Sequence, residues 1–344
     1  MNTKAIVFTR RAHAEWIEAP LSALGETDVQ VKLAVSTISS GTERANFLDD
    51  GLLSVAKGAV AGDNRYPKRL GYSSAGVVTA VGAKVKSVKV GDRVATWWGT
   101  HSEYICLPEK TILKLDDQIS FAEAALWHIA TFPLAAIRKT RLELGESAIV
   151  MGMGVLGLMA VKLLAAAGAA PIIAVDPVEE KRALALKQGA DYAFDPFDPD
   201  FEKNVREVTG GGVKVAIEVT GSGKALDQVL DCMAPFGRVA LLGCTRHSDF
   251  SINYYSKVHG PGISLIGAHT RARPQDESYP GYFTTYDDMA AIQSLVKAGR
   301  LSFLPLVEET HSPSEATEIY DRLGREKAFP VVQFDYSLLK EDEK

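Results

Sequence analysis

The sequence contains little cysteine. Its 344 residues include three, Cys106, Cys232 and Cys244, which lie far apart and form no Cys-x-x-Cys pair. This spacing provides neither a disulfide framework nor a cysteine-rich zinc site. We therefore expect buried, reduced thiols.

Long apolar runs and an excess of positive charge are missing as well. The longest apolar stretch, 156–175, is interrupted by Lys162 and by a Gly/Ala/Pro-rich turn. It predicts a helix followed by a strand, not a membrane span of ~20 residues. The first residues alternate like a strand and lack the apolar core of a signal peptide, so we expect a cytoplasmic protein. A formal net charge of −5 without long like-charge runs argues against nucleic-acid and membrane partners and favours a small polar molecule.

The sequence contains two regions with different patterns of apolar residues. Residues 1–108 form short alternating runs punctuated by glycine and proline, which is typical of a β-barrel; Gly76, Gly82 and Gly91 are expected at turns or bulges. From 147 to about 267, strand-like and helix-like runs alternate, which predicts a parallel sheet covered by helices. The last segment, with two predicted helices and a final strand, is expected to rejoin the first domain.

The strongest motif is a glycine-rich turn. Gly152, Gly154 and Gly157 follow an apolar strand and open an amphipathic helix, and Asp176 ends the next strand nineteen positions after Gly157. This pattern predicts a dinucleotide site, because the glycines let the backbone approach a pyrophosphate at a helix N-terminus. The Asp176 carboxylate favours NAD over NADP, since it accepts from ribose hydroxyls and repels a 2′-phosphate. Lys181 and Arg182 leave NADP open as the alternative.

Several further motifs carry a resemblance to a known family. They are SGTE (40–43), GYSSAGVVTAVG (71–82), GDRVA (91–95), SEYICLP (102–108), IEVTGSG (217–223) and GRVALLG (237–243). With the glycine-rich turn, they resemble the medium-chain dehydrogenase/reductase superfamily of the alcohol dehydrogenase type. The resemblance implies an α/β protein with a GroES-like β-barrel catalytic domain at 1–125 and 273–344. It also implies a Rossmann doubly wound parallel-sheet NAD-binding domain at 126–272.

The resemblance also implies the cofactor contacts, with the nicotinamide in the cleft between the domains. The expected cofactor residues are Gly152, Met153, Gly154, Val155, Leu156, Gly157, Asp176, Lys181, Thr220, Gly243, Cys244 and Ala268.

The zinc positions of the family depart from its pattern. Zinc-dependent relatives have cysteine, histidine and a third cysteine or acid at places that hold Ser40, Tyr72 with Ser73, and His128 here. One imidazole, a phenol and hydroxyls do not form the usual ligand set of a catalytic zinc. No cysteine cluster marks a structural zinc either, so we expect no metal at either place.

Without zinc, alcohol oxidation needs a general base. His128 is the candidate, because the resemblance places it where relatives hold a zinc ligand; the alternative is a packed core histidine. Thr42 matches a proton-relaying hydroxyl or is a turn residue, and Tyr72 contacts the substrate oxygen or fills the vacated metal space. Candidate substrate residues are Ser40, Glu43, Trp98 and His269, with a structural ion pair as the other interpretation of Glu43.

This set of hydroxyl, imidazole and aromatic side chains favours a polyhydroxylated substrate. The sequence predicts an NAD-dependent dehydrogenase that oxidises a secondary alcohol of a sugar, glycoside or cyclitol. The alternatives are a zinc-independent quinone or enoyl reductase, a non-catalytic nucleotide-binding member, and a metal enzyme using His128 and Glu43. The apolar segment GISLIGA (262–268) suggests pairing of sheet edges, and hence a homodimer or a tetramer.

Overall fold

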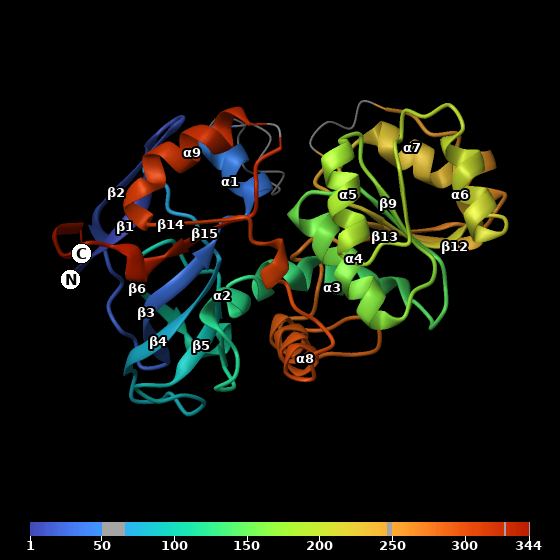
Figure 1. Ribbon diagram of the computed structural model, residues 1–344. Coiled ribbons are helices and arrows are strands. Elements are labelled where there is room, and N and C mark those ends of the chain that lie inside the picture. The colour runs from blue at the N-terminus through green and yellow to red at the C-terminus, as the bar shows by residue number, and fades with distance from the viewer. Residues whose placement is uncertain (50–65, 246–249, 327, 344) are drawn as a thin grey trace. The chain divides into compact units, whose positions relative to one another are not determined.

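The computed structural model describes residues 1–49, 66–245, 250–326 and 328–343. The chain divides into two compact units, unit 1 with Met1–Ile129 and Met289–Lys344, and unit 2 with Ala130–Asp288 (Figure 1). The second boundary lies further along the chain than the expected 272/273. Buried Asp288 forms ion pairs with both Arg138 and Arg273, which hold the chain up to Asp288 in unit 2.

Unit 1 is built mainly from strands. Its seven-stranded sheet has the order β14-β15-β3-β4-β5-β7, with β6 paired to β3, and β1 and β2 form a separate antiparallel pair. The strands are β1 (Asn2–Arg10), β2 (His13–Pro20), β3 (Asp28–Thr37), β4 (Ser73–Val81), β5 (Arg93–Trp97), β6 (Tyr104–Pro108), β7 (Ile112–Lys114), β14 (Glu309–His311) and β15 (Val332–Asp335).

The helices of unit 1 are short. They are α1 (Ser40–Phe47), α2 (Phe121–Ala124) and α9 (Ala316–Arg325), with single 3-10 turns at Glu109–Thr111, Leu304–Leu306, Pro313–Glu315, Tyr336–Leu338 and Glu341–Glu343. Two longer helices, α3 (Trp127–Thr140) and α8 (Thr285–Lys297), each begin in one unit and end in the other.

The C-terminal segment of unit 1 joins the sheet that the N-terminal segment forms. β15 pairs antiparallel with β3, so that Phe334 lies opposite Ser36. Gly76 lies opposite Leu33 in β3, next to a bulge in the β3–β4 pairing, and a Cβ there would come within 2.1 Å of the Lys32 carbonyl. The predicted role of Gly76 at a bulge is therefore confirmed, because only glycine permits this approach of the two backbones.

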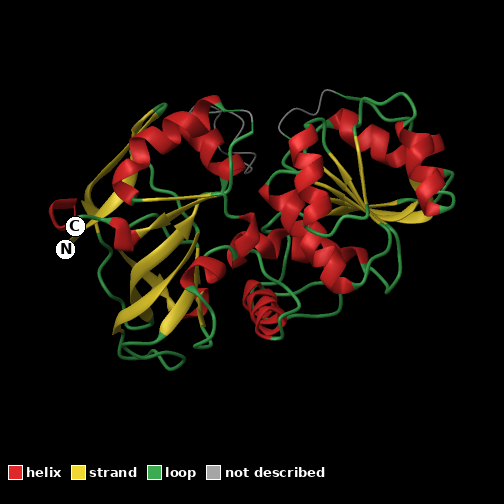
Figure 2. Cartoon of the chain, viewed as in Figure 1, coloured by secondary structure: helices red, strands yellow, loops and turns green. Residues whose placement is uncertain are grey.

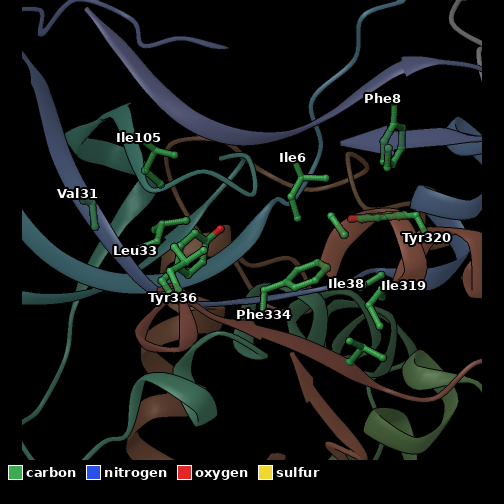
Figure 3. Close-up of a cluster of buried hydrophobic side chains, with 14 of the residues drawn as sticks. Ile6, Phe8, Val31, Leu33, Ile38, Ile105, Ile319, Tyr320, Phe334 and Tyr336 are labelled. Carbon is green, nitrogen blue, oxygen red and sulfur yellow. The ribbon is translucent and has the colours of Figure 1, made fainter. Parts of the chain in front are cut away.

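The core of unit 1 follows from strand alternation. Val29, Val31 and Leu33 of β3 are buried, while Lys32 faces solvent. Figure 3 shows side chains from distant parts of the chain in this core, including Ile6, Phe8, Tyr320 and Phe334. Each fully buried apolar side chain of this size contributes about 1.5–3 kcal/mol to the free energy of folding. The core therefore stabilises the packing of the C-terminal segment against the N-terminal strands.

Unit 2 has the alternation that the sequence predicts. Its six-stranded parallel sheet has the order β10-β9-β8-β11-β12-β13. The strands are β8 (Ala148–Met151), β9 (Ile172–Val175), β10 (Tyr192–Phe194), β11 (Val213–Glu218), β12 (Met233–Leu241) and β13 (Ser264–Gly267). Helices α4 (Val155–Ala167), α5 (Glu179–Lys187), α6 (Phe201–Thr209) and α7 (Gly223–Asp231) flank it, and a π-helical turn covers Tyr255–His259 (Figure 2).

This strand order reverses direction beside β8, the first strand of the unit. In such sheets the crevice at the carboxyl ends of the strands on either side of the reversal is the usual ligand site. The apolar stretch 156–175 divides into α4 and β9, as predicted. Within the described residues, no helix is both long and apolar enough to cross a membrane.

Candidate functional site

The turn from β8 into α4 has the close approaches that the glycine pattern predicts. Gly152 has a φ of +99°, and a Cβ there would lie 2.8 Å from Cγ2 of Thr220. A Cβ on Gly157 would lie 1.8 Å from the Gly152 carbonyl oxygen, so α4 packs directly on the turn. A Cβ on Gly154, by contrast, would meet no atom within 4 Å. The turn is therefore closed toward the protein and open at Gly154.

The open side of the turn is the N-terminus of α4. Gly154 is the N-cap residue, and no side chain caps this end of the helix. The first N–H groups of a helix have no partner inside it and carry a partial positive charge. Backbone around Gly154, Val155 and Leu156 thus offers donors to an anion.

Asp176 is fixed at the end of β9. Its carboxylate accepts hydrogen bonds from the backbone N–H groups of Met153, at 2.8 Å, and of Val178, at 2.9 Å. Arg182 donates to the Asp176 carbonyl at 2.7 Å and lies 3.4 Å from Asp195, so its charge is engaged inside the protein. The carboxylate thus borders the glycine-rich turn, and the Arg182 guanidinium is held by the Asp176 carbonyl and by Asp195.

The loops after β11 and β12 complete this edge of the sheet. A Cβ on Gly243 would come within 2.2 Å of the Gly221 nitrogen, so the two loops touch through their backbones. Buried Glu218 holds the first loop, accepting hydrogen bonds from the N–H groups of Thr220 and Gly221 and from the Thr220 hydroxyl. Burial raises the pKa of Glu218, although these hydrogen bonds oppose the rise.

The segment after β13 is held by a buried lysine. Lys139 of α3 donates to the carbonyls of Gly267, at 3.0 Å, and of Ala272, and so fixes both ends of the segment that contains Ala268 and His269. Burial lowers the pKa of Lys139, and the neighbouring charge of Arg273 lowers it further. The pKa of His269 is lowered by burial and by Arg271 and Lys139.

The predicted cofactor residues therefore gather at one edge of one sheet. The set follows the carboxyl ends of β8, β9, β11, β12 and β13: residues 152–157, Asp176, Thr220, Gly243, Cys244 and Ala268. Lys181 lies on α5, immediately after the β9 loop. The open turn, the uncapped helix and the fixed carboxylate suit a dinucleotide, whose pyrophosphate needs donors and whose ribose needs an acceptor.

A second polar cluster lies in unit 1, at the start of α1. The Tyr72 hydroxyl is hydrogen-bonded to the Ser39 hydroxyl, and it donates to the Thr42 hydroxyl at 3.4 Å. Ser39 is the N-cap residue of α1, and Ser40 is its first residue. Thr42 is exposed and Tyr72 is half-buried. Three hydroxyls thus meet at one helix N-terminus, and sequence reasoning had identified two of them.

Aromatic rings surround this cluster. The His128 ring lies 5.5 Å from the Tyr72 ring and 4.8 Å from the Trp98 ring, edge-on in both cases, and stacks on Trp97 at 6.4 Å. His128 is buried, whereas 43% of Trp98 is exposed. The structure therefore brings Thr42, Tyr72, His128 and Trp98 together.

The expectation that Glu43 contacts the substrate is wrong. Glu43 is completely buried, and its carboxylate accepts hydrogen bonds from the Ser39 N–H at 2.7 Å, from His101 Nε2 at 3.1 Å and from the Tyr320 hydroxyl. His101 in turn contacts Ser36 through Nδ1 at 2.7 Å. The pKa of Tyr320 is raised by burial and by Glu43. Glu43 instead holds Ser39, and with it the N-terminus of α1.

Comparisons with known proteins identify the family of this chain. Residues 25–117 match the alcohol dehydrogenase GroES-like domain, and residues 155–284 match the family described as zinc-binding dehydrogenase. The L-threonine 3-dehydrogenase of Pyrococcus furiosus is 34% identical over 276 residues, which are 71% of this chain and 74% of that protein. The chain belongs to the medium-chain dehydrogenase/reductase superfamily.

Two further proteins with a similar sequence or structure are also dehydrogenases. The crystal structure of 2R,3R-butanediol dehydrogenase from Bacillus subtilis has a TM-score of 0.82 and 25% identity, and covers 97% of this chain and 99% of that one. The D-guloside 3-dehydrogenase of Escherichia coli is 26% identical over 62% of this chain and 61% of its own length. This medium-chain dehydrogenase is an oxidoreductase that acts on CH–OH groups of small molecules.

Hydroxyl side chains occupy two of the positions that the family resemblance assigns to zinc ligands. Ser40 begins α1, Tyr72 belongs to the hydroxyl cluster, and the Ser73 hydroxyl donates to the Ala125 carbonyl at 2.7 Å. Among the residues that the structure describes, no three or more histidine, cysteine or acidic side chains form a group able to hold a metal ion.

Sequence reasoning missed three residues that shape the dehydrogenase site. Ser39 joins Tyr72 to Glu43, Lys139 fixes the segment after β13, and Glu218 fixes the loop after β11. A signal existed for Ser39, because a serine directly before a helix is a preferred N-cap. Lys139 and Glu218 gave no local signal, because most of their partners are backbone groups.

Proposed function

We propose that this protein is an NAD-dependent dehydrogenase that oxidises a secondary alcohol of a polyhydroxylated substrate, without a catalytic zinc ion. The class of substrate is a sugar, a glycoside or a cyclitol. The observation that carries the proposal is the cluster in unit 1, where the Tyr72 hydroxyl bonds to Ser39 and Thr42 beside the rings of His128 and Trp98. Hydroxyl groups next to an exposed indole suit a ring that carries several hydroxyls.

The cofactor assignment rests on Asp176. Its fixed carboxylate beside the glycine-rich turn accepts from ribose hydroxyls and repels a 2′-phosphate, which favours NAD over NADP. The residues at 152–157 hold the pyrophosphate, and the backbone around Gly243, Cys244 and Ala268 lines the nicotinamide half. When bound, NAD accepts the hydride from the substrate carbon.

The remaining chemistry is proton transfer at the substrate oxygen. Exposed Thr42 and half-buried Tyr72 present their hydroxyls to that oxygen, and His128, in edge contact with Tyr72, acts as the general base. A positioned base contributes about 10²–10⁴-fold to the rate. In a second candidate mechanism, Tyr72 is present as the phenolate, accepts the proton of the substrate hydroxyl and becomes the neutral phenol. The position of its oxygen at the N-terminus of α1 favours this, because a helix N-terminus stabilises negative charge.

The proposed function is tested by measuring NADH formation with hexoses, methyl hexosides, inositols and simple alcohols, with and without a chelator. Turnover of a ring polyol that survives the chelator supports the proposal. Loss of activity with the chelator contradicts the zinc-free mechanism. Reduction of quinones or enones by NADPH, without oxidation of any polyol, indicates the reductase alternative.

Two variants separate the candidate bases. If His128 is the base, H128Q lowers kcat at least about a hundredfold and removes the pH dependence on the acidic side, while Y72F has a smaller effect. The reverse order assigns the proton to Tyr72. T131S, an alteration one turn along α3 from His128, is the matched control and retains activity and stability.

The proposed assembly is a homodimer. β13 is the edge strand of the unit 2 sheet and leaves Leu265 39% exposed. Unpaired edges of this kind bind a second strand. Light scattering after size exclusion that gave a monomer near 37 kDa would contradict the dimer.

A further inference from the structure

A pocket in unit 1 adjoins the hydroxyl cluster and is not used by the proposed reaction. Its volume is about 110 Å³, and it is lined by Pro20–Ser22, Arg69, Trp98–Thr100 and Tyr104–Leu107. The lining comes from the end of β2 and the loop after it, the segment before β4 that contains Arg69, the turn after β5, and strand β6. All of it lies within one unit, so the sheet and its loops define the pocket.

Trp98 joins this pocket to the hydroxyl cluster. Trp98 is one of the lining residues, and its ring lies 5.6 Å from the Tyr72 ring and 4.8 Å from the His128 ring. The Trp98 backbone has a φ of +64°, and its N–H donates to the Tyr72 carbonyl at 3.1 Å. Left-handed backbone costs a bulky residue about 1–3 kcal/mol and is often found at ligand-binding positions. A substrate whose hydroxyl reaches Tyr72 can thus extend along the Trp98 indole into the pocket.

The charge of the pocket is positive. Arg69 is the one charged side chain among the lining residues, all of which the structure describes, and none of them is acidic. Its Nη1 donates to the Pro20 carbonyl at 2.7 Å, which holds one side of the guanidinium. A guanidinium has five N–H donors, so one such bond does not exhaust its capacity to bind an anion. The pocket is therefore positive although the whole chain has a net charge of −5. Guanidinium groups pair with carboxylates and phosphates through parallel hydrogen bonds.

We propose that this pocket binds an anionic substituent of the substrate, a carboxylate or a phosphate ester, through Arg69. The inference rests on the proposed function, since it requires the oxidised hydroxyl at Tyr72. It also specifies the substrate class: a polyol or glycoside with an acidic group, its ring against Trp98. The hydroxyls of Thr100 and Tyr104, in the same lining, supply further donors to the anion.

The test compares three substrates that share one ring: a methyl hexoside, the corresponding methyl hexuronoside, and the methyl hexoside 6-phosphate. We expect wild-type kcat/KM to be at least about tenfold higher for one or both anionic substrates than for the neutral one. R69Q removes this preference, because it lowers kcat/KM for the anionic substrates much more than for the neutral one. The arm that shows the preference distinguishes carboxylate from phosphate.

R11Q is the matched control. Arg11 is also exposed and also donates to a backbone carbonyl, that of Leu48 at 2.8 Å, but it does not line the pocket. R11Q should keep the wild-type preference. An equal preference in R69Q and wild type overturns the proposal. So does an equal loss on all three substrates in R69Q, because Arg69 then only fixes the loop at Pro20.

A binding measurement keeps this inference separate from the proposed function. Tryptophan fluorescence of the full chain is titrated with the hexuronoside and with the hexoside phosphate. A saturable change that weakens at least about tenfold in R69Q, and whose amplitude falls in W98F, supports the pocket even if no polyol is oxidised. Oxidation of neutral polyols, with no anion preference and no such change, retains the proposed function and overturns the pocket.

Discussion

Replacing Gly154 with alanine separates folding from cofactor binding. The backbone of Gly154 has a φ of −73°, which alanine adopts without strain, and the new Cβ meets no atom within 4 Å. The folded protein loses only the preference for glycine over alanine at a helix N-cap, which is below about 1 kcal/mol. The free energy of unfolding should therefore change little.

Binding of the dinucleotide should change much more. The same open space lies over the first N–H groups of α4, where the pyrophosphate is proposed to bind. A methyl group there holds the phosphate away from these donors. A hydrogen bond to a charged group contributes about 1.5–3 kcal/mol, so the loss of one raises the Kd for NADH about ten- to a hundredfold.

Gly157 is the matched comparison in the same helix. Its Cβ would lie 1.8 Å from the Gly152 carbonyl oxygen, so G157A forces α4 away from the turn. Overpacking of this kind costs about 3 kcal/mol, and the better helix propensity of alanine returns about 1 kcal/mol. G157A should thus destabilise the protein by about 2 kcal/mol and also weaken NADH binding.

The two variants are compared by urea unfolding and by calorimetric titration with NADH. If G154A binds NADH as tightly as wild type, the pyrophosphate does not lie at this turn. If G154A is destabilised as much as G157A, the open space at Gly154 does not exist in solution. Either result would refute the geometric argument.

Three further variants test other parts of the structure. D176S removes the carboxylate that repels a 2′-phosphate, so the ratio of kcat/KM for NAD to that for NADP should fall at least about tenfold; an unchanged ratio contradicts the role of Asp176. D288N removes the charge that two arginines share in the interior of unit 2, and should cost about 3–5 kcal/mol in urea unfolding, whereas a loss near zero would show that the pairs are not maintained. Burial acts to lower the pKa of His311, but its hydrogen bonds to two glutamates outweigh this and raise the pKa, so the stabilisation is complete below the unfolded pKa and disappears as the pH rises through the folded pKa. H311Q should therefore lower stability by up to about 1 kcal/mol near pH 5.5 and hardly at all near pH 8.5, and an equal loss at both would contradict the ion pairs.

The sequence by itself determined the parts of this protein that local patterns encode. Alternation and glycine spacing identify the β-rich and the parallel α/β parts, and the dinucleotide turn at 152–157 is fixed by the strand, glycines and helix that surround it. Asp176 was also identifiable, because it follows a buried strand at a set distance from the turn. These features depend on interactions between residues that are close in the chain, so a short segment of sequence is enough to predict them.

Only the tertiary structure decided how the hydroxyl cluster and the neighbouring pocket of unit 1 are formed. Glu43 is buried because Tyr320, 277 residues away, and His101, 58 residues away, both donate to it. The pocket at Arg69 exists because four separate segments of unit 1, one of which carries Trp98, meet there. Such groups are brought together by the pairing of strands that are distant in the sequence. The hydrogen bonds that stabilise a buried carboxylate or orient a hydroxyl come from these distant partners, which no local pattern specifies.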